Sequence, residues 1–120
     1  LFVVQAFHSA TRGAPTGVVV EAGGKAIYDA GDTALFGDMG LVSELYKPEV
    51  ALIPIGGYYT MGPNEAAEAV RLVRPKTAIP MHYKTFPVLT QTGDEFVRMV
   101  REKAPNVRVL LLKSGETHQF

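Results

Sequence analysis

The stretch from residue 50 to residue 81, VALIPIGGYYTMGPNEAAEAVRLVRPKTAIPM, decides the fold. Its almost fully apolar opening, 50–55, is typical of a strand that is covered on both faces. Pro63 suits the first position of a helix, and Pro75 ends that helix. The apolar positions between them share one helical face: Ala66, Ala69, Val70 and Val73. A second buried strand is predicted over 77–81. This strand–helix–strand order predicts a layered α/β domain.

The N-terminal part adds strands to this unit. A strand is predicted to end within Leu1–Phe7, and 8–16 has the Ser, Thr, Arg, Gly and Pro content of a loop. Two strand-like runs, Gly17–Ala22 and Lys25–Asp29, are separated by Gly23-Gly24. Two glycines between short strands predict a tight hairpin.

Two more helices and a last strand complete the predicted elements. A stripe at helical spacing contains Leu35, Met39, Val42 and Tyr46. That helix should end near Lys47, because Pro48 disfavours helical geometry in the residue before it. Thr92 and Glu95 have the spacing of a capping box and predict the start of a third helix. Its apolar face contains Phe96, Val100 and Ala104, and Val107–Leu112 is the last apolar run.

Composition excludes several classes of protein. The chain has 120 residues, of which 47% are hydrophobic, so it can build a core. Twelve basic and twelve acidic residues give zero formal charge, which argues against a nucleic-acid partner. No apolar run approaches the roughly 20 residues of a membrane span, so no membrane partner is expected. The absence of cysteine excludes disulfides and thiolate metal sites and fits a cytoplasmic protein. The opening Leu1-Phe2-Val3-Val4 reads as the inside of a strand, which predicts a piece of a longer chain.

Three side chains capable of binding metal follow three different predicted strands: His8, Asp32 and His82. The carboxyl ends of strands are where chemistry collects in α/β sheets, so we expect the three to converge. Neutral imidazole and carboxylate are good ligands for zinc, manganese or ferrous iron. Each of the three also has a purely structural interpretation. The histidines can be capping or packing residues, and Asp32 can be a turn or helix cap.

Other candidates could contact a substrate. Arg12 and Lys84 lie in the loops of His8 and His82 and could bind an anionic group, although solvated surface charge is the default. Tyr59 and Thr60 lie in the loop that begins at Gly56-Gly57, which could line a pocket or simply turn the chain.

The motifs, taken in order, resemble the metallo-β-lactamase superfamily. They are Ala6-Phe7-His8-Ser9, Asp29-Ala30-Gly31-Asp32-Thr33 and Ile79-Pro80-Met81-His82-Tyr83. With Gly56-Gly57-Tyr58-Tyr59-Thr60-Met61-Gly62-Pro63, they look like the metal-dependent hydrolases near the ascorbate-6-phosphate lactonases. The H-x-H-x-D-H motif of the superfamily's first half is absent from this sequence. The resemblance therefore implies the C-terminal half of an αββα sandwich, a mixed sheet with flanking helices over 1–120.

The resemblance also implies a site and a chemistry. His8 would bind a first metal ion, His82 a second, and Asp32 would bridge both as the catalytic carboxylate. The two divalent ions would be zinc by default, with manganese or iron as alternatives. A metal-bridged hydroxide would then attack a small ester, lactone or phosphoester. The remaining ligands would come from the N-terminal half, so the enzyme would be active only with that half present.

Two other functions stay open at this point. One is a nuclease of the same fold, against which the neutral charge counts. The other is a non-catalytic scaffold or interaction module that kept the fold and lost the site. The substrate, the physiological metal and a homo-oligomeric state are not determined by the sequence.

Overall fold

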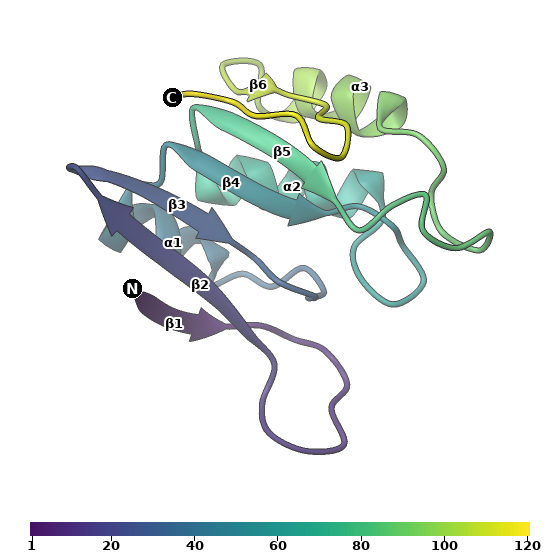
Figure 1. Ribbon diagram of the computed structural model, residues 1–120, viewed down its shortest axis with the longest axis horizontal. Helices are drawn as coiled ribbons and strands as arrows, with labels where there is room; N and C mark the ends of the chain where they lie inside the picture. The colour runs from purple at the N-terminus through teal and green to yellow at the C-terminus, as the bar shows by residue number, and fades with distance from the viewer.

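The alternation of apolar strands and amphipathic helices gives one six-stranded sheet in the computed structural model, which describes residues 1–120 (Figure 1). The strands are β1 (Phe2–Gln5), β2 (Thr16–Ala22), β3 (Lys25–Asp29), β4 (Val50–Pro54), β5 (Thr77–Met81) and β6 (Arg108–Val109). The helices are α1 (Met39–Tyr46), α2 (Pro63–Val73) and α3 (Asp94–Lys103). The predicted fold class, a mixed sheet with flanking helices, is confirmed.

The strands lie in the sheet in the order in which they occur in the chain. β1, β2 and β3 are antiparallel neighbours, whereas β3, β4, β5 and β6 are parallel. A helix connects the two strands of each parallel pair. Because these crossovers share one handedness and run in the same direction along the sheet, all three helices lie on the same face. Figure 1 shows α1 and α2 behind the strands. None of the three helices is long and apolar enough to cross a membrane.

The hairpin between β2 and β3 forms where the glycine pair predicts it. Ala22 pairs with Lys25, so Gly23 and Gly24 alone make the turn. Their φ values of +59° and +78° are those of a type I′ turn, which suits glycine because L side chains are strained there.

The core lies between the sheet and the helices. Alternate residues of the central strands point to this side and are fully buried: Val19, Tyr28, Ala51, Ile53 and Ala78. They meet the predicted face of α2, in which Ala66, Ala69, Val70 and Val73 are all buried. Phe96 and Val100 of α3 close the same core. The period of 3.6 residues in the helices and of two in the strands therefore places one apolar layer against another.

The opposite face of the sheet carries apolar side chains but no helix. Val18, Ile27, Leu52 and Ile79 lie on it and are half-buried, and Val20 is 41% exposed. Half of a two-sheet sandwich is expected to leave apolar side chains of its sheet partly in water, and the sequence predicts Val18, Val20, Ile53 and Ile79 among them. The expectation is wrong for Ile53, because its position in the strand turns it toward the helices.

The helix starts differ from the sequence prediction in two places. α1 begins at Met39, so Leu35 lies before the helix and packs against the core from the preceding segment. α3 follows Gly93 with no side-chain cap, and Glu95 faces Arg98 at 3.9 Å instead of reaching back to Thr92. The capping carboxylate occurs at α2, where Glu65 accepts the Gly62 N–H at 2.7 Å.

The last strand is shorter than the apolar run 107–112 predicts. β6 has two residues, and the pairing ends where the Leu110 N–H donates to the Ala78 carbonyl. Leu111 then packs against Gly93, where a Cβ atom would lie only 2.6 Å from its side chain. The chain therefore leaves the sheet at the point where Leu111 meets Gly93.

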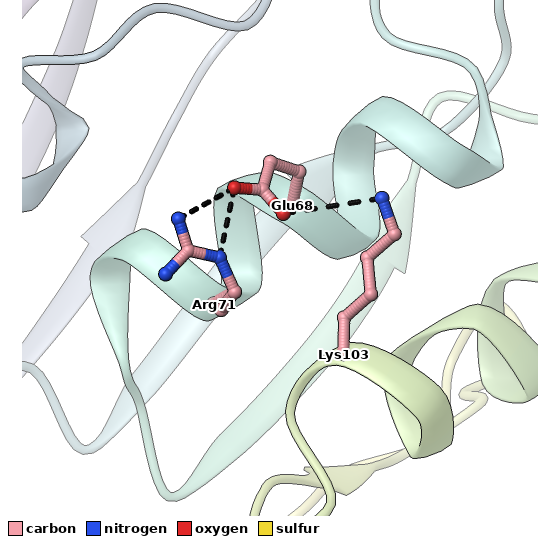
Figure 2. A network of polar contacts seen from close by, with 3 residues as sticks. All are labelled: Glu68, Arg71 and Lys103. Carbon is pink, nitrogen blue, oxygen red and sulfur yellow. Dashed lines mark hydrogen bonds and ion pairs between the residues drawn. The ribbon is translucent and has the colours of Figure 1, made fainter.

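An ion-pair network joins α2 to α3 at the surface (Figure 2). Glu68 accepts from Arg71 Nε at 2.8 Å and lies 2.6 Å from Arg71 Nη2, one turn along α2. Its other oxygen lies 3.9 Å from Lys103 Nζ of α3. The Arg71 hydrogen bond is the main cause that holds the pKa of Glu68 below its usual value.

Tyr28 makes the stability of the fold depend on pH in the alkaline range. Its hydroxyl is buried without a hydrogen-bond partner, and burial, helped by the Asp29 charge, raises the pKa of Tyr28 to about 12. In the unfolded chain the Tyr28 hydroxyl ionises near pH 10.0. Between pH 10 and pH 12 this ionisation stabilises the unfolded chain but not the folded one, so the free energy of unfolding falls.

We predict that the full-length protein loses up to about 2–3 kcal/mol over this window through Tyr28. Tyr28→Phe should remove that part of the loss. At neutral pH the variant should be as stable or about 1 kcal/mol more stable, because the hydroxyl has no partner to lose. Urea unfolding of both proteins at about pH 8 and about pH 11 measures this. An equal alkaline decline in the two proteins would contradict the assignment.

Candidate metal centre

Asp32 is presented by a tight turn after β3. Gly31 adopts φ +63°, and a Cβ there would lie 2.6 Å from the Thr16 carbonyl oxygen, so the turn requires glycine. The Gly31 N–H donates to Asp29 Oδ1 at 2.9 Å. Asp29 is therefore the turn-capping carboxylate, and no backbone N–H donates to Asp32. The Asp32 side chain is 49% exposed and free to bind another group.

His8 is brought beside Asp32 by a buried threonine that sequence reasoning missed. The Thr33 hydroxyl is buried and accepts the Phe7 N–H at 2.9 Å, and the Ala34 N–H donates to the Phe7 carbonyl at 2.8 Å. These bonds tie the start of the β1–β2 loop to the turn that carries Asp32. His8 and Asp32 consequently line one hollow of about 290 Å³.

The ring of His8 is oriented by its own loop. Nδ1 lies 2.9 Å from the Ser9 carbonyl oxygen. A carbonyl only accepts, so this bond places the proton on Nδ1 and leaves the Nε2 lone pair free. Histidines that bind metal commonly hold their second nitrogen in this way.

His82 follows β5 and faces Asp32 across the sheet edge. Its backbone has φ +53°, an uncommon conformation for a residue with a side chain. Nε2 lies 3.7 Å from Asp32 Oδ2, which is too long for a hydrogen bond. Nδ1 is buried with no hydrogen-bond partner. The capping role therefore does not account for His82, because neither ring nitrogen makes a hydrogen bond within the chain.

Gly56 explains how the two side chains meet. β4 lies between β3 and β5, which places those two strands about 9–10 Å apart. Gly56 follows β4, and a Cβ there would lie 2.2 Å from the His82 carbonyl oxygen and 3.2 Å from Nδ1. Because the middle position has no side chain, Asp32 and His82 can approach each other. The only sequence signal for this role is a glycine directly after a buried strand.

The expected convergence is realised for a pair and not for a set of three. Asp32 lies close to His82, and His8 shares a hollow with Asp32. No three His, Cys, Asp or Glu side chains of the chain form a group that could hold a metal ion. The structure therefore shows the Asp32–His82 pair and the hollow that His8 shares with Asp32, and metal binding by all three stays a prediction.

The pair nevertheless fits a metal ion by its chemistry and spacing. Two ligands of a tetrahedral zinc ion, each about 2.0–2.2 Å from it, lie roughly 3.3–3.6 Å apart. The Nε2–Oδ2 distance of 3.7 Å is close to that value. A neutral nitrogen and a carboxylate oxygen, neither of them used in a hydrogen bond, form a donor set that zinc, manganese and iron accept.

The residues predicted to contact substrate differ in their surroundings. Lys84 lines the same groove as His82. Tyr59 is 59% exposed and packs edge-to-face against Tyr58, with ring centroids 4.6 Å apart. The Thr60 hydroxyl is buried without a partner, and Arg12 is exposed in the β1–β2 loop with no ion pair.

Comparison with known proteins establishes the family. Residues 1–83 match the family described as the Beta-lactamase superfamily domain. A UPF0173 metal-dependent hydrolase from Caldivirga maquilingensis is 50% identical over 116 residues, which is 97% of this chain and 51% of that protein. The chain therefore spans about half the length of the curated relatives it matches. It belongs to the metallo-β-lactamase superfamily.

Solved structures agree with this assignment. Igni18, a metallo hydrolase from Ignicoccus hospitalis, superposes with a TM-score of 0.90 and 45% identity, covering 98% of this chain and 51% of that chain. YhfI from Bacillus subtilis, a metallo-β-lactamase fold protein, superposes with a TM-score of 0.76 at 12% identity, covering 95% and 46%. This second likeness shows the fold alone.

We predict that Gly56→Ala displaces His82 from Asp32. The added methyl group would overlap a backbone oxygen, so the full-length protein should lose about 1–3 kcal/mol of unfolding free energy. Gly62→Ala, at the other end of the same loop, is the control, because its Cβ would meet only Glu65 Oε2 at 3.4 Å. Urea unfolding and a crystal structure of each variant measure the two effects. An unchanged His82–Asp32 distance in Gly56→Ala would refute the positioning role.

Proposed function

We propose that the protein is a metal-dependent hydrolase of the metallo-β-lactamase fold, to whose site this chain contributes His8, Asp32 and His82. The observation that carries the proposal is the Asp32–His82 pair, held 3.7 Å apart with no hydrogen bond to satisfy either group. The names of the relatives, metal-dependent hydrolase and metallo hydrolase, point in the same direction.

Each residue has a defined part in this proposal. Asp32 has two carboxylate oxygens, so it is the side chain able to serve two cations at once. His8 and His82 supply neutral nitrogens, which leave the positive charge of the ions undiminished. Two divalent ions, zinc first and manganese or iron as alternatives, would lower the pKa of a bound water and polarise the substrate. The proposed substrate is a small ester, lactone or phosphoester, and the lack of cysteine favours the cytoplasm.

We further propose that the open face of the sheet is covered by the N-terminal half of a longer chain. The curated relatives are about twice the length of the segment they share with this chain. No helix covers this apolar face, on which Val18, Val20, Ile27, Leu52 and Ile79 are half-buried or exposed. The C-terminal Phe120 lies beside Val20 and Ile27 at one end of it. The same half would bring the metal ligands that this chain lacks, since the pair here needs further donors.

Residues 1–120 expressed alone should therefore associate or stay partly molten. The open face would meet water, and exposed apolar patches of this kind drive aggregation. Sedimentation and binding of a hydrophobic dye, with the full-length protein as reference, measure this. A soluble monomer that unfolds cooperatively would contradict the proposal that another half covers this face.

Metal content separates the hydrolase from a non-catalytic scaffold. The full-length protein should hold about two metal ions per chain, whereas a scaffold that lost its site should hold none. The unsatisfied His82 ring favours an intact site. Zero net charge in this chain disfavours a nuclease of the same fold.

Asp32→Asn should lose most of the bound metal and most of the activity of the full-length protein. The amide keeps the shape of the carboxylate but removes the negative charge that two cations require. Asp32→Ala should have the same effect. Metal analysis by mass spectrometry, and turnover of a model lactone or phosphodiester with added zinc or manganese, measure both quantities.

Asp38→Asn is the matched control, because Asp38 precedes α1 and its side chain makes no cap hydrogen bond. It should keep full metal content and turnover. If Asp32→Asn also keeps both, Asp32 is not a ligand and the proposed site is wrong.

A further inference from the structure

A groove of about 750 Å³ runs from His82 along the neighbouring loops. Its walls are three short segments, 80–85, 91–94 and 111–114. Most of the side chains that line it are polar, and His82 is one of them. The groove therefore shares His82 with the candidate metal centre, whereas His8 and Asp32 line a separate hollow.

The topology of the sheet creates this groove. β5 and β6 are parallel neighbours, so the segments that follow them leave the sheet at the same end. The segment after β5 is fixed by the Lys84 N–H, which donates to the Thr90 carbonyl at 2.8 Å, and by Tyr83, which packs against the core. The segment after β6 is fixed where Leu111 fills the space beside Gly93.

Two lysines, one from each segment, line the groove, and the Glu116 carboxylate accepts the Lys113 backbone N–H at 2.9 Å. No carboxylate lies within ion-pair distance of the Lys84 or Lys113 ammonium groups, whereas Lys76 pairs with Glu49 and Lys103 with Glu68. Lys84 is held at φ +63°, so its position is set by the loop. Asp94 also lines the groove, which leaves one net positive charge among the lining residues.

The remaining lining side chains include hydrogen-bond donors. Thr85, Thr92 and Ser114 carry hydroxyl groups. The Gln91 amide also lines the groove, but its Nε2 donates to the Phe86 and Leu89 carbonyls. Ammonium groups together with such donors are the chemistry that binds an oxyanion, a phosphate or a carboxylate.

We propose that this groove, with Lys84 and Lys113, binds the oxyanion group of a small substrate whose reacting bond lies at His82 and Asp32. The substrate class is then an anionic ester, lactone or phosphoester rather than a neutral one. This inference rests on the proposed hydrolase function, which it narrows to charged substrates.

The binding test uses the metal-loaded full-length protein, titrated calorimetrically with inorganic phosphate and, separately, with acetate. Lys84→Ala with Lys113→Ala should weaken the oxyanion binding event about tenfold, and each single change about threefold to fivefold. Lys84→Arg should retain it. Lys47→Ala is the matched control, because Lys47 also has a positive φ, of 47°, and lines a different hollow. The event should persist after a chelator removes the metal.

Binding that the double variant leaves unchanged, or that disappears with the metal, would overturn the groove proposal. Preference for phosphate over acetate, or the reverse, identifies which oxyanion the groove takes.

A kinetic comparison keeps this proposal distinct from the hydrolase proposal. The double variant should raise the KM for an anionic ester, 4-nitrophenyl succinate, about fivefold or more and leave 4-nitrophenyl acetate unchanged. If neither ester is hydrolysed with zinc or manganese while oxyanion binding persists and depends on both lysines, the hydrolase proposal fails and the oxyanion site stands. If both esters are hydrolysed and the double variant changes neither KM, the groove proposal fails and the hydrolase proposal stands.

Discussion

The parallel register of β3, β4 and β5 is the constraint on which the candidate site depends. Asp29 pairs with Leu52, and Leu52 pairs with Ile79, so the three strands end at nearly the same level. Asp32 and His82 leave the outer two strands, and Gly56 leaves the middle one. Because Gly56 has no side chain, the carboxylate and the imidazole meet above it at 3.7 Å. Any larger residue there would collide with the His82 backbone.

Helices cover one face of the sheet, and no helix covers the other. Crossovers of a single hand put α1, α2 and α3 on one side, where Tyr28, Ile53 and Phe96 are fully buried. The other side keeps an apolar surface that includes Val20, 41% exposed. The same asymmetry applies to the candidate site, where Asp32 and His82 pair at the sheet edge but no three such side chains group together. Both observations support the proposal that a second half completes the domain.

Local patterns predicted the elements whose cause is local. The glycine pair gave the β2–β3 turn, Pro63 began α2, and the apolar run over 77–81 is β5 with the same bounds. The predictions that failed have more than one cause. β6 ends where Leu111 packs against Gly93, a contact between separate segments. The start of α3 differs locally, because Gly93 and not Thr92 precedes the helix and Glu95 faces Arg98 one turn along. A pattern along the chain contains no information about which distant side chain occupies the adjacent space.

The same division applies to function. The sequence by itself determined the layered α/β class, the positions of His8, Asp32 and His82 after strands, and the family resemblance, because each depends on residue type and spacing. Only the tertiary structure decided that Asp32 lies 3.7 Å from His82, that His8 shares a hollow with Asp32, and that Asp29, not Asp32, caps the turn. It also revealed Thr33 as the residue that ties His8 to the Asp32 turn. The physical reason is that the Thr33–Phe7 and Asp32–His82 contacts join residues 26 and 50 positions apart, and only the packing of the sheet fixes their distances. The Asp29 cap is local, but residue type alone does not say which of the two carboxylates accepts the Gly31 N–H.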